Sequence, residues 1–495
     1  MASLHSLGQP EDLATTFIPP VDGVPNEILV EIFALVPGLP HDVLWLVCRR
    51  WRRICTGTPS LWTRIDDKGW HSGRISLAAV YARPGIKSLR LRNIQTAIVE
   101  ADINLLIALY RHLEQLSLTG TAASLQALFQ HAHNADAAQM RSLTVINEPD
   151  NDARSADDCE IRLPRMSALV HLVLDHVSMG VSAWLTLRVQ NLVRLELHYC
   201  APVHYSLLLH VLRQCHALRD LTLDNVLSVT PPSEGLSTEA APLDLPNELR
   251  RLSISDEPHL LARIQPFLHI PAGANLELST SDFICDAATI ASVAPFVQAK
   301  IRNKQAPVLD TIHIDARVGL RFGLSSSSSD GTAFRLTTRC SAVDEDACVS
   351  VLFEMLCLPS ITCIELKYTR DLSSSFWRSL VDTFPAPITI SIGDCDGRGS
   401  ETLFLKALRD APQKAALLSV IRLRVAPVAI LRPLASAMGS LILLAHQLAG
   451  TSSPSLRWFE IVDYPECRGL RGRVSQAVKD ATTDMDGIRM DVVYV

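Results

Sequence analysis

The sequence predicts an α/β repeat solenoid, in which a curved parallel sheet carries its helices on the outer side, preceded by a small all-α bundle. Three observations predict this fold. The length of 495 residues exceeds what one compact core usually holds, so the chain contains several domains or a repeat array. Two short apolar stripes at helical spacing occur near the N-terminus. A short leucine phrase then returns along most of the remaining chain.

The composition is that of a folded protein, with 48% apolar, 20% charged and 5% aromatic residues. The net charge of -6 disfavours general binding to nucleic acid or to anionic membranes. Twelve cysteines without C-x-x-C pairing are typical of reduced thiols. We therefore expect a soluble cytoplasmic or nuclear protein without cofactor, bound to neither nucleic acid nor membrane.

Residues 1–19 are expected to form a flexible tail. The opening segment MASLHSLGQPEDLATTFIPPVDG carries Glu11 and Asp12 and no basic region, unlike a signal peptide. The longest uncharged stretch, residues 433–456, is interrupted by proline and polar residues. This pattern favours a buried helix over a membrane span.

Residues 20–65 begin with an amphipathic helix. Pro25 suits its first turn, where a missing N–H is harmless, and Glu27 complements the positive end of the helix dipole. Prolines at 37 and 40 end it. Its apolar stripe comprises Ile28, Leu29, Ile32, Phe33 and Val36.

A second helix is expected to follow Asp42. Its stripe comprises Val43, Leu44, Val47, Cys48, Trp51 and Ile54, and its other faces carry Arg49, Arg50, Arg52 and Arg53. Such a basic cluster also occurs in nuclear-localisation signals and nucleic-acid patches, but the apolar context of Trp51 favours a solvated helix face. About 35 residues of helix cannot bury so many large side chains. Part of this surface therefore meets either the following domain or another protein.

The run VPNEILVEIFALVPGLPHDVLWLVCRRWRRICTGTPSLWTRI resembles an F-box. It shows the proline, Glu-Ile-Leu, Ile-Phe, a turn, Val-Cys-x-x-Trp and a closing Pro-Ser-Leu-Trp. The resemblance implies a small helical bundle that docks on a Skp-type adaptor, and through it on a cullin and a RING subunit, in an SCF ubiquitin ligase. It marks as core or adaptor-facing positions Pro25, Ile28, Leu29, Ile32, Phe33, Val47, Cys48 and Trp51.

After Trp62 the phrase L-x-x-L-x-L recurs as LEQLSL, LVHLVL, LVRLEL, LRDLTL, LRRLSI, LDTIHI, ITCIEL and LRWFEI. Its anchoring leucines repeat at the spacing of leucine-rich repeats. A strand places alternate residues inward, and a segment such as residues 204–218 returns as an outer helix. Stacked units bury a leucine core that no single unit could make. The anchors are Leu89, Leu116, Leu143, Leu172, Leu195, Leu221 and Leu252.

The array resembles the leucine-rich repeats often found behind an F-box in fungal-type proteins. It departs from the usual pattern because only Cys200 supplies the Asn or Cys of the consensus. We expect a linker or connecting helix at residues 66–85 and regular repeats at 86–257. Residues 258–495 are expected to continue the solenoid irregularly, with NLELS and ITISI as strands. Exposed loops are expected in EPDNDARSADDCE, TPPSEGLSTEAAPLDLP, SSSSSDG and GDCDGRGS.

The residues beside the core leucines are expected to face the concave surface in rows about 4.8 Å apart. One row is Arg92, Thr119, Ile146, Asp175, His198, Asp224 and Ser255; another is Ser88, Gln115, Ser142, His171, Arg194, Asp220 and Arg251. One polar patch follows, consisting of His171, Asp175, Arg194, Glu196, His198, Asp220 and Asp224. Its carboxylates and histidines suit a metal site, an acid/base pair, a client-binding surface or a solvated face.

The sequence gives little support for a metal site, a phosphate loop or a catalytic nucleophile elsewhere in the chain. His131, His133 and Asp136 are close enough for a metal but have no thiolate nearby, which favours a polar loop. No phosphate loop, G-x-S-x-G or H-E-x-x-H motif occurs. The apolar helical context of Cys48 predicts a buried small residue and not a nucleophile.

These patterns predict a non-catalytic substrate-recognition subunit of an SCF-type ubiquitin ligase, whose F-box holds a Skp-type adaptor while the repeats hold a protein client. The alternative is a leucine-rich-repeat scaffold without a ligase role. An enzyme within residues 258–495 is a third possibility. The sequence does not name the client.

Overall fold

The computed structural model describes residues 23–35, 41–67, 72–82, 85–94, 100–131, 135–148, 159–200, 203–228, 242–301, 309–315, 320–325, 332–340, 345–356, 360–367, 372–383, 389–395, 400–411, 413, 420–425, 458–463 and 489–494. The predicted helix at 433–456 and most residues of the four predicted loops lie outside these ranges. Among the described helices, none is both long enough and apolar enough to cross a bilayer.

The N-terminal unit consists of four short helical segments, which are α1 (Asn26–Leu35), α2 (His41–Val47), α3 (Arg49–Gly57) and the 3-10 turn η2 (Pro59–Trp62). The first turn of α1 starts at Pro25, whose carbonyl accepts a hydrogen bond from the Leu29 N–H at 3.1 Å. The Trp62 indole N–H donates to the Cys55 carbonyl at 2.8 Å. The end of the unit is thereby tied to α3.

The second predicted helix is interrupted at Cys48, which corrects the expectation of one continuous helix. Cys48 is extended (φ -160°, ψ 169°) and its sulfur accepts a hydrogen bond from the Trp51 N–H, so it acts as the N-cap of α3. Its side chain is exposed, and the prediction of a buried cysteine is therefore wrong. The apolar spacing of Val47, Trp51 and Ile54 continues across the break, which hides it from a sequence pattern.

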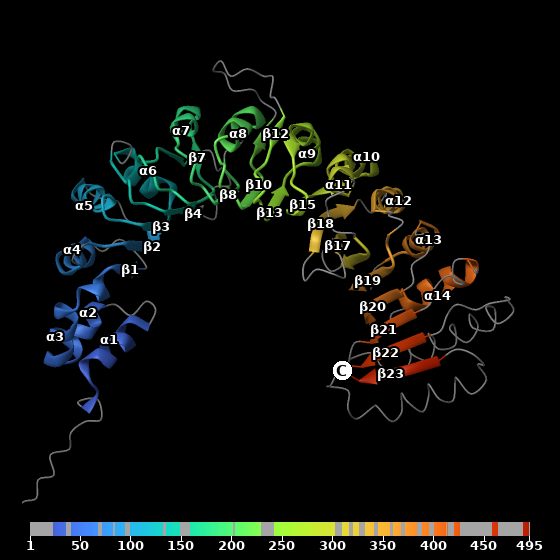
Figure 1. Cartoon of the computed structure of the whole chain (residues 1–495), viewed down its shortest axis with the longest axis horizontal. Helices are drawn as coiled ribbons and strands as arrows, with labels where there is room; N and C mark the ends of the chain where they lie inside the picture. Colours follow the sequence, from blue (N-terminus) through green and yellow to red (C-terminus); the bar gives the residue numbers. More distant parts are fainter. Residues whose placement is uncertain are drawn as a thin grey trace, which may run out of the picture.

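After this unit, most strands of the described chain join one sheet of seventeen strands (Figure 1). Every neighbouring pair is parallel except the two pairs made by β17. From one edge to the other the order is β1 (Arg64–Asp67), β2 (Ser88–Ile94), β3 (Gln115–Gly120), β4 (Ser142–Asn147), β6 (His171–Asp175), β8 (Arg194–His198), β10 (Asp220–Asp224), β13 (Arg251–Ser255), β15 (Asn275–Cys285), β18 (Thr332–Cys340), β17 (Leu320–Ser325), β16 (Thr311–Asp315), β19 (Cys363–Lys367), β20 (Thr389–Cys395), β21 (Val420–Val425), β22 (Trp458–Asp463) and β23 (Arg489–Tyr494).

The predicted leucine anchors lie opposite one another across this sheet. Leu89 pairs with Leu116, and the ladder continues through the other five anchors to Leu252 and then to Leu276. All of these side chains are buried. The parallel register therefore stacks equivalent leucines into one continuous core, as the repeat spacing predicts.

The sheet departs from the expected plan in two places. It begins at β1, before Ile86, because Arg64–Asp67 pairs with β2 in parallel. In its middle, β16 lies three places beyond β15, because β18 and β17 lie between them; β17 runs antiparallel to both of its neighbours, and β18 pairs with β15. NLELS lies in β15, and residues 389–392 of ITISI lie in β20, as expected.

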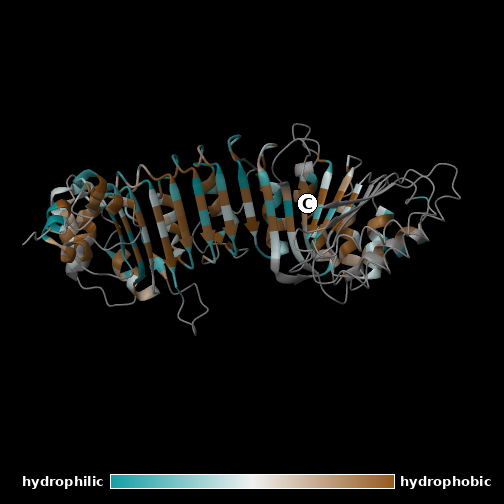
Figure 2. Cartoon of the chain, turned by 90° about the horizontal axis from the view of Figure 1, so that it is seen from below, coloured by the Kyte–Doolittle hydropathy of each residue, from teal (hydrophilic) through white to brown (hydrophobic). Residues whose placement is uncertain are grey.

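Helices cover one side of the sheet, on the outside of the arc seen in Figure 1. Viewed from the inner side, the strands lie next to one another along the whole molecule (Figure 2). This arrangement is compatible with the predicted α/β repeat fold. The helices are α4 (Ser72–Tyr81), α5 (Glu100–Tyr110), α6 (Ala122–Gln130), α7 (Val181–Thr186), α8 (Tyr205–Leu212), α9 (Pro258–Ile264), α10 (Ala287–Ser292), α11 (Ala294–Ile301), α12 (Glu345–Leu356), α13 (Ser374–Thr383) and α14 (Ser400–Asp410).

Four non-glycine residues of the described chain have positive φ: His176, Tyr199 and Asn225 begin the turns that directly follow β6, β8 and β10, and Asn93 lies in β2 at its irregularity. Short outer strand pairs follow some of these turns: β5 (Glu160–Ile161) with β7 (Ser178–Met179), β9 (Val203–His204) with β11 (Leu227–Ser228), and β12 (Leu243–Asp244) with β14 (Leu268–His269). Asp256 is buried at one such turn. Its carboxylate accepts backbone N–H bonds from Val226, Leu227 and Glu257 at 2.8–2.9 Å.

Candidate functional site

The first candidate surface is the outer side of α1. Leu29 and Phe33 are each 2% exposed and form the buried side of this helix, whereas Ile28 and Ile32 are 50% and 45% exposed. Leu35 continues the exposed stripe because it lies seven residues after Ile28. The predicted stripe is thus divided into a core side and a solvent side.

The same division occurs in α2. Leu44 is buried, and Val43, Leu46 and Val47 are exposed. Nine large hydrophobic side chains are exposed among the described residues, and six of them belong to α1 and α2. Scattered exposed leucines need no explanation, but such a concentration in two short helices is typical of a protein-interaction surface.

The remaining helix α3 stabilises the unit from inside. Ile54 and Cys55 are buried, and the Trp51 ring packs against the Phe33 ring with centroids 4.7 Å apart. Burial raises the pKa of the Cys55 thiol to about 11, so this cysteine is a packing residue. Trp51 therefore contributes to the core of the unit.

Arg50 from the predicted basic cluster also has a structural role. Its guanidinium donates to the Asn26 side chain at 2.8 Å and to the Val24 carbonyl. These bonds join α3 to the start of α1. Since Arg50 is engaged in this way, its charge is not part of an open basic patch.

The second candidate surface is the predicted polar patch on the concave side of the sheet. The predicted row from Ser88 to Arg251 pairs in register through all seven strands. The row through Asp175, His198 and Asp224 also pairs in register from Thr119 to Ser255. Its first member, Arg92, lies at an irregularity between β2 and β3 and is unpaired in the ladder.

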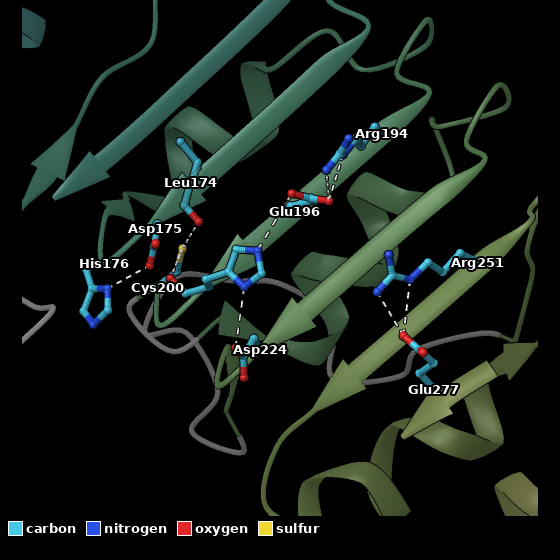
Figure 3. Close-up of polar contacts among 10 residues, drawn as sticks. Leu174, Asp175, His176, Arg194, Glu196, Cys200, Asp224, Arg251 and Glu277 are labelled. Atoms are coloured by element: carbon cyan, nitrogen blue, oxygen red, sulfur yellow. Dashed lines mark hydrogen bonds and ion pairs between the residues drawn. The ribbon is translucent and has the colours of Figure 1, made fainter. Parts of the chain in front are cut away.

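Four members of the patch contact one another (Figure 3). The Arg194 guanidinium lies 2.6 Å from the Glu196 carboxylate. The other oxygen of Glu196 lies 3.9 Å from His198 Nε2, and the Asp224 carboxylate lies 3.5 Å from His198 Nδ1. The imidazole therefore bridges two carboxylates on opposite sides of its ring.

The electrostatics of this bridge favour the imidazolium form. The hydrogen bond to Asp224 raises the pKa of His198, and the charges of Asp175, Asp224 and Glu196 add to this effect while burial opposes it. The histidine is 28% exposed, so solvent reaches it. Protonation of His198 accordingly changes the charge of this face, at a pH above the ordinary histidine range.

The other members of the patch are placed differently. Asp175 contacts the adjacent His176 at 2.8 Å. His171 and Asp220 lie in the neighbouring row and form no ion pair within the part of the chain that the structure describes. The sequence analysis missed His176 and Tyr199, whose rings stack at 4.9 Å at the ends of β6 and β8. The sequence could have indicated this pair, because His176 and Tyr199 directly follow the row residues Asp175 and His198.

A metal site is not supported by this geometry. The two carboxylates contact different nitrogens of His198, so the three side chains do not converge on one point. No cluster of three or more potential metal ligands occurs among the described residues. His131 and Asp136 belong to the described chain, whereas His133 lies outside it. The patch is a polar surface in which arginine, histidine and carboxylate side chains contact one another.

Comparison with known families identifies one region. Residues 21–68 match the F-box-like family, and this segment covers about a tenth of the chain. No curated protein matches the chain significantly. The chain therefore carries an F-box-like domain, which includes α1, α2, α3, η2 and the first strand of the sheet. F-box domains generally bind Skp-type adaptors and have a non-catalytic substrate-adaptor role.

Proposed function

We propose that this protein is a substrate-recognition subunit of an SCF-type ubiquitin ligase. The observation that carries the proposal is the division of the F-box-like helices into a buried side and an exposed apolar side. The exposed side chains of α1 and α2 dock on a Skp-type adaptor, which connects the chain to a cullin. The repeats bind a protein client.

The F-box positions have distinct roles in this proposal. Leu29 and Phe33 hold the unit together, with Trp51 packed against them. Ile28, Ile32 and Val47 face the adaptor, and burying each of them there contributes about 1 kcal/mol or more. The first turn of α1 begins at Pro25, and Cys48 is the N-cap of α3. These two residues therefore set where the helices of the unit begin.

The client is proposed to bind the concave patch of His171, Asp175, Arg194, Glu196, His198, Asp220 and Asp224. This patch contains four carboxylates and one arginine, so a client segment with basic side chains complements it. The mechanism is positional. A client lysine held near the charged conjugating enzyme reacts at high effective concentration, and no side chain of this chain takes part in the transfer.

The cytoplasm or nucleus is the proposed location. Seven cysteines in the described ranges are free thiols, and the buried ones Cys159, Cys200 and Cys215 have pKa values raised by burial to about 12. Unpaired thiols are typical of a reducing compartment.

Adaptor docking is tested by co-purification of the full-length protein with a Skp-type adaptor and cullin. We expect the wild type to capture both and the double variant Ile28→Asp/Ile32→Asp to capture neither, because two charges cannot be buried against an apolar partner. Val80→Asp is the matched control, since Val80 is 65% exposed on α4, outside the F-box-like segment. Failure of the folded wild type to capture the adaptor would favour a repeat scaffold without a ligase role.

Client binding is tested by reversing the charges of Arg194, Asp220 and Asp224 together. All three side chains lie at the surface, so circular dichroism should be unchanged. We expect loss of client proteins and unchanged capture of the adaptor. Client capture that survives the triple reversal would exclude the patch as the client site.

A further inference from the structure

A hollow of about 960 Å³ lies between the end of α1, the turn η2 and the first four strands of the sheet. One wall consists of Phe33, Ala34 and Leu35, and another of the η2 residues Leu61 and Trp62. The volume falls within the usual range of about 300–1,000 Å³ for binding pockets. The hollow adjoins the concave patch on the same face of the sheet, since Ser142 in its lining pairs with His171 of the patch.

Its floor is a grid of side chains from β1, β2, β3 and β4. The register gives one row of Arg64, Ser88, Gln115 and Ser142, and a second row of Asp66, Arg90, Ser117 and Thr144. Thr119 and Ile146 complete the floor. Neighbouring strands lie about 4.8 Å apart, so the grid extends about 14 Å across four strands.

The positive charges of this floor are not neutralised. The Asp66 carboxylate is occupied by Arg92, which lies outside the lining and contacts it at 2.8 Å. Within the described ranges, no carboxylate forms an ion pair with Arg64 or Arg90, and both arginines are exposed. These two guanidinium groups on the floor of the hollow can therefore bind an anionic group.

Hydroxyl groups continue the floor from these arginines onto β3 and β4. The side chains of Ser117, Thr119, Ser142 and Thr144 make no hydrogen bond with another residue of the described chain. Each hydroxyl can donate one hydrogen bond. The floor therefore offers charged donors on β1 and β2 and neutral donors on β3 and β4.

We propose that this hollow binds a protein segment that carries an anionic side chain next to an apolar one. The anionic group, a carboxylate or a phosphoryl group, contacts Arg64 and Arg90. The apolar neighbour packs on Ala34 and Leu77 of the lining. A segment fits better than a free small anion because the floor is long enough for about four extended residues and has an apolar wall along one side. The inference goes beyond the proposed function and does not depend on adaptor docking.

The proposal is tested by fluorescence anisotropy with the full-length protein and degenerate peptide mixtures. Each mixture has leucine beside a fixed central residue, which is phosphoserine, glutamate or glutamine. We expect at least one anionic mixture to bind at least tenfold more tightly than the glutamine mixture. The phosphoserine and glutamate mixtures distinguish the two sources of negative charge. Rising salt should weaken the binding.

The matched variants are Arg64→Gln/Arg90→Gln and Lys87→Gln/Arg111→Gln. Both pairs remove two exposed positive charges, but Lys87 and Arg111 lie outside the lining. We expect at least a tenfold loss of affinity for the first pair and less than a twofold change for the second. The proposal is overturned if the anionic mixtures show no preference, if the first pair binds like the wild type, or if only inorganic phosphate binds.

Discussion

At single positions, buried and half-buried carboxylates stabilise the turns and tune the charge of the concave face. Asp256 is 4% exposed, and burial raises its pKa while three backbone N–H bonds oppose this effect. His198 is held between Glu196 and Asp224 on the open side of the sheet. Asp256 therefore stabilises its turn, and His198 makes the charge of the concave face depend on pH.

Replacing Asp256 with alanine should lower the free energy of unfolding by about 2–4 kcal/mol, because the buried N–H groups of Val226 and Leu227 lose their acceptor. Hydrogen exchange should show faster exchange at these two amides. Asp244→Ala is the control, since the Asp244 side chain is 91% exposed. Unchanged exchange at 226 and 227 would contradict this role of the carboxylate.

The Asp224→Asn variant should lower the pKa of His198, because the hydrogen bond to Asp224 is the largest cause of its elevation. In the wild type the imidazolium stabilises the folded state. That contribution is complete below the ordinary histidine value of about 6.5 and is lost as the pH rises through the raised value. Titration of the assigned His198 ring protons by NMR measures the shift. An unchanged titration midpoint would show that Asp224 does not control this histidine.

At the scale of elements, the leucine phrases predict the strands from β2 to β15 because inward and outward residues alternate along a strand. The same alternation predicts which residues of the concave patch lie next to each other. Three features carry no such signal. RIDD in β1 lacks a leucine phrase, β17 runs antiparallel through residues 320–325, and Cys48 is not among the usual N-cap residues. The hollow beside Arg64 was not predicted because strand β1, which supplies Arg64 to its lining, was not predicted.

The end of β3 depends on a residue without a side chain. A Cβ atom added at Gly120 would lie 2.6 Å from the Ile94 carbonyl oxygen on β2. Gly120→Ala should therefore destabilise the protein by about 1–3 kcal/mol, measured as a lower urea midpoint. Gly73→Ala on α4 is the control, because a Cβ there meets no atom within 4 Å. Equal midpoints for the two variants would contradict the close approach of β2 and β3.

At the scale of the whole molecule, three surfaces follow one another along the chain. The exposed apolar side chains of α1 and α2 come first, and the unpaired arginines Arg64 and Arg90 follow at the first strands. The carboxylate-rich patch then occupies β6, β8 and β10. In Figure 1 these strands lie well along the arc from the N-terminal helices. In the proposed function, this separation allows one chain to bind an adaptor and a client at the same time.

Site-specific photo-crosslinking to a purified Skp-type adaptor tests whether α1 and α2 dock on the adaptor while the concave patch stays free of it. A benzophenone amino acid is placed at Leu46, at Val80 or at His198, which are all exposed or half-exposed positions. If α1 and α2 form the docking surface, we expect an adaptor crosslink from position 46 and none from positions 80 and 198. An adaptor crosslink from position 198, or none from position 46 in the folded protein, would contradict the separation of adaptor and client surfaces.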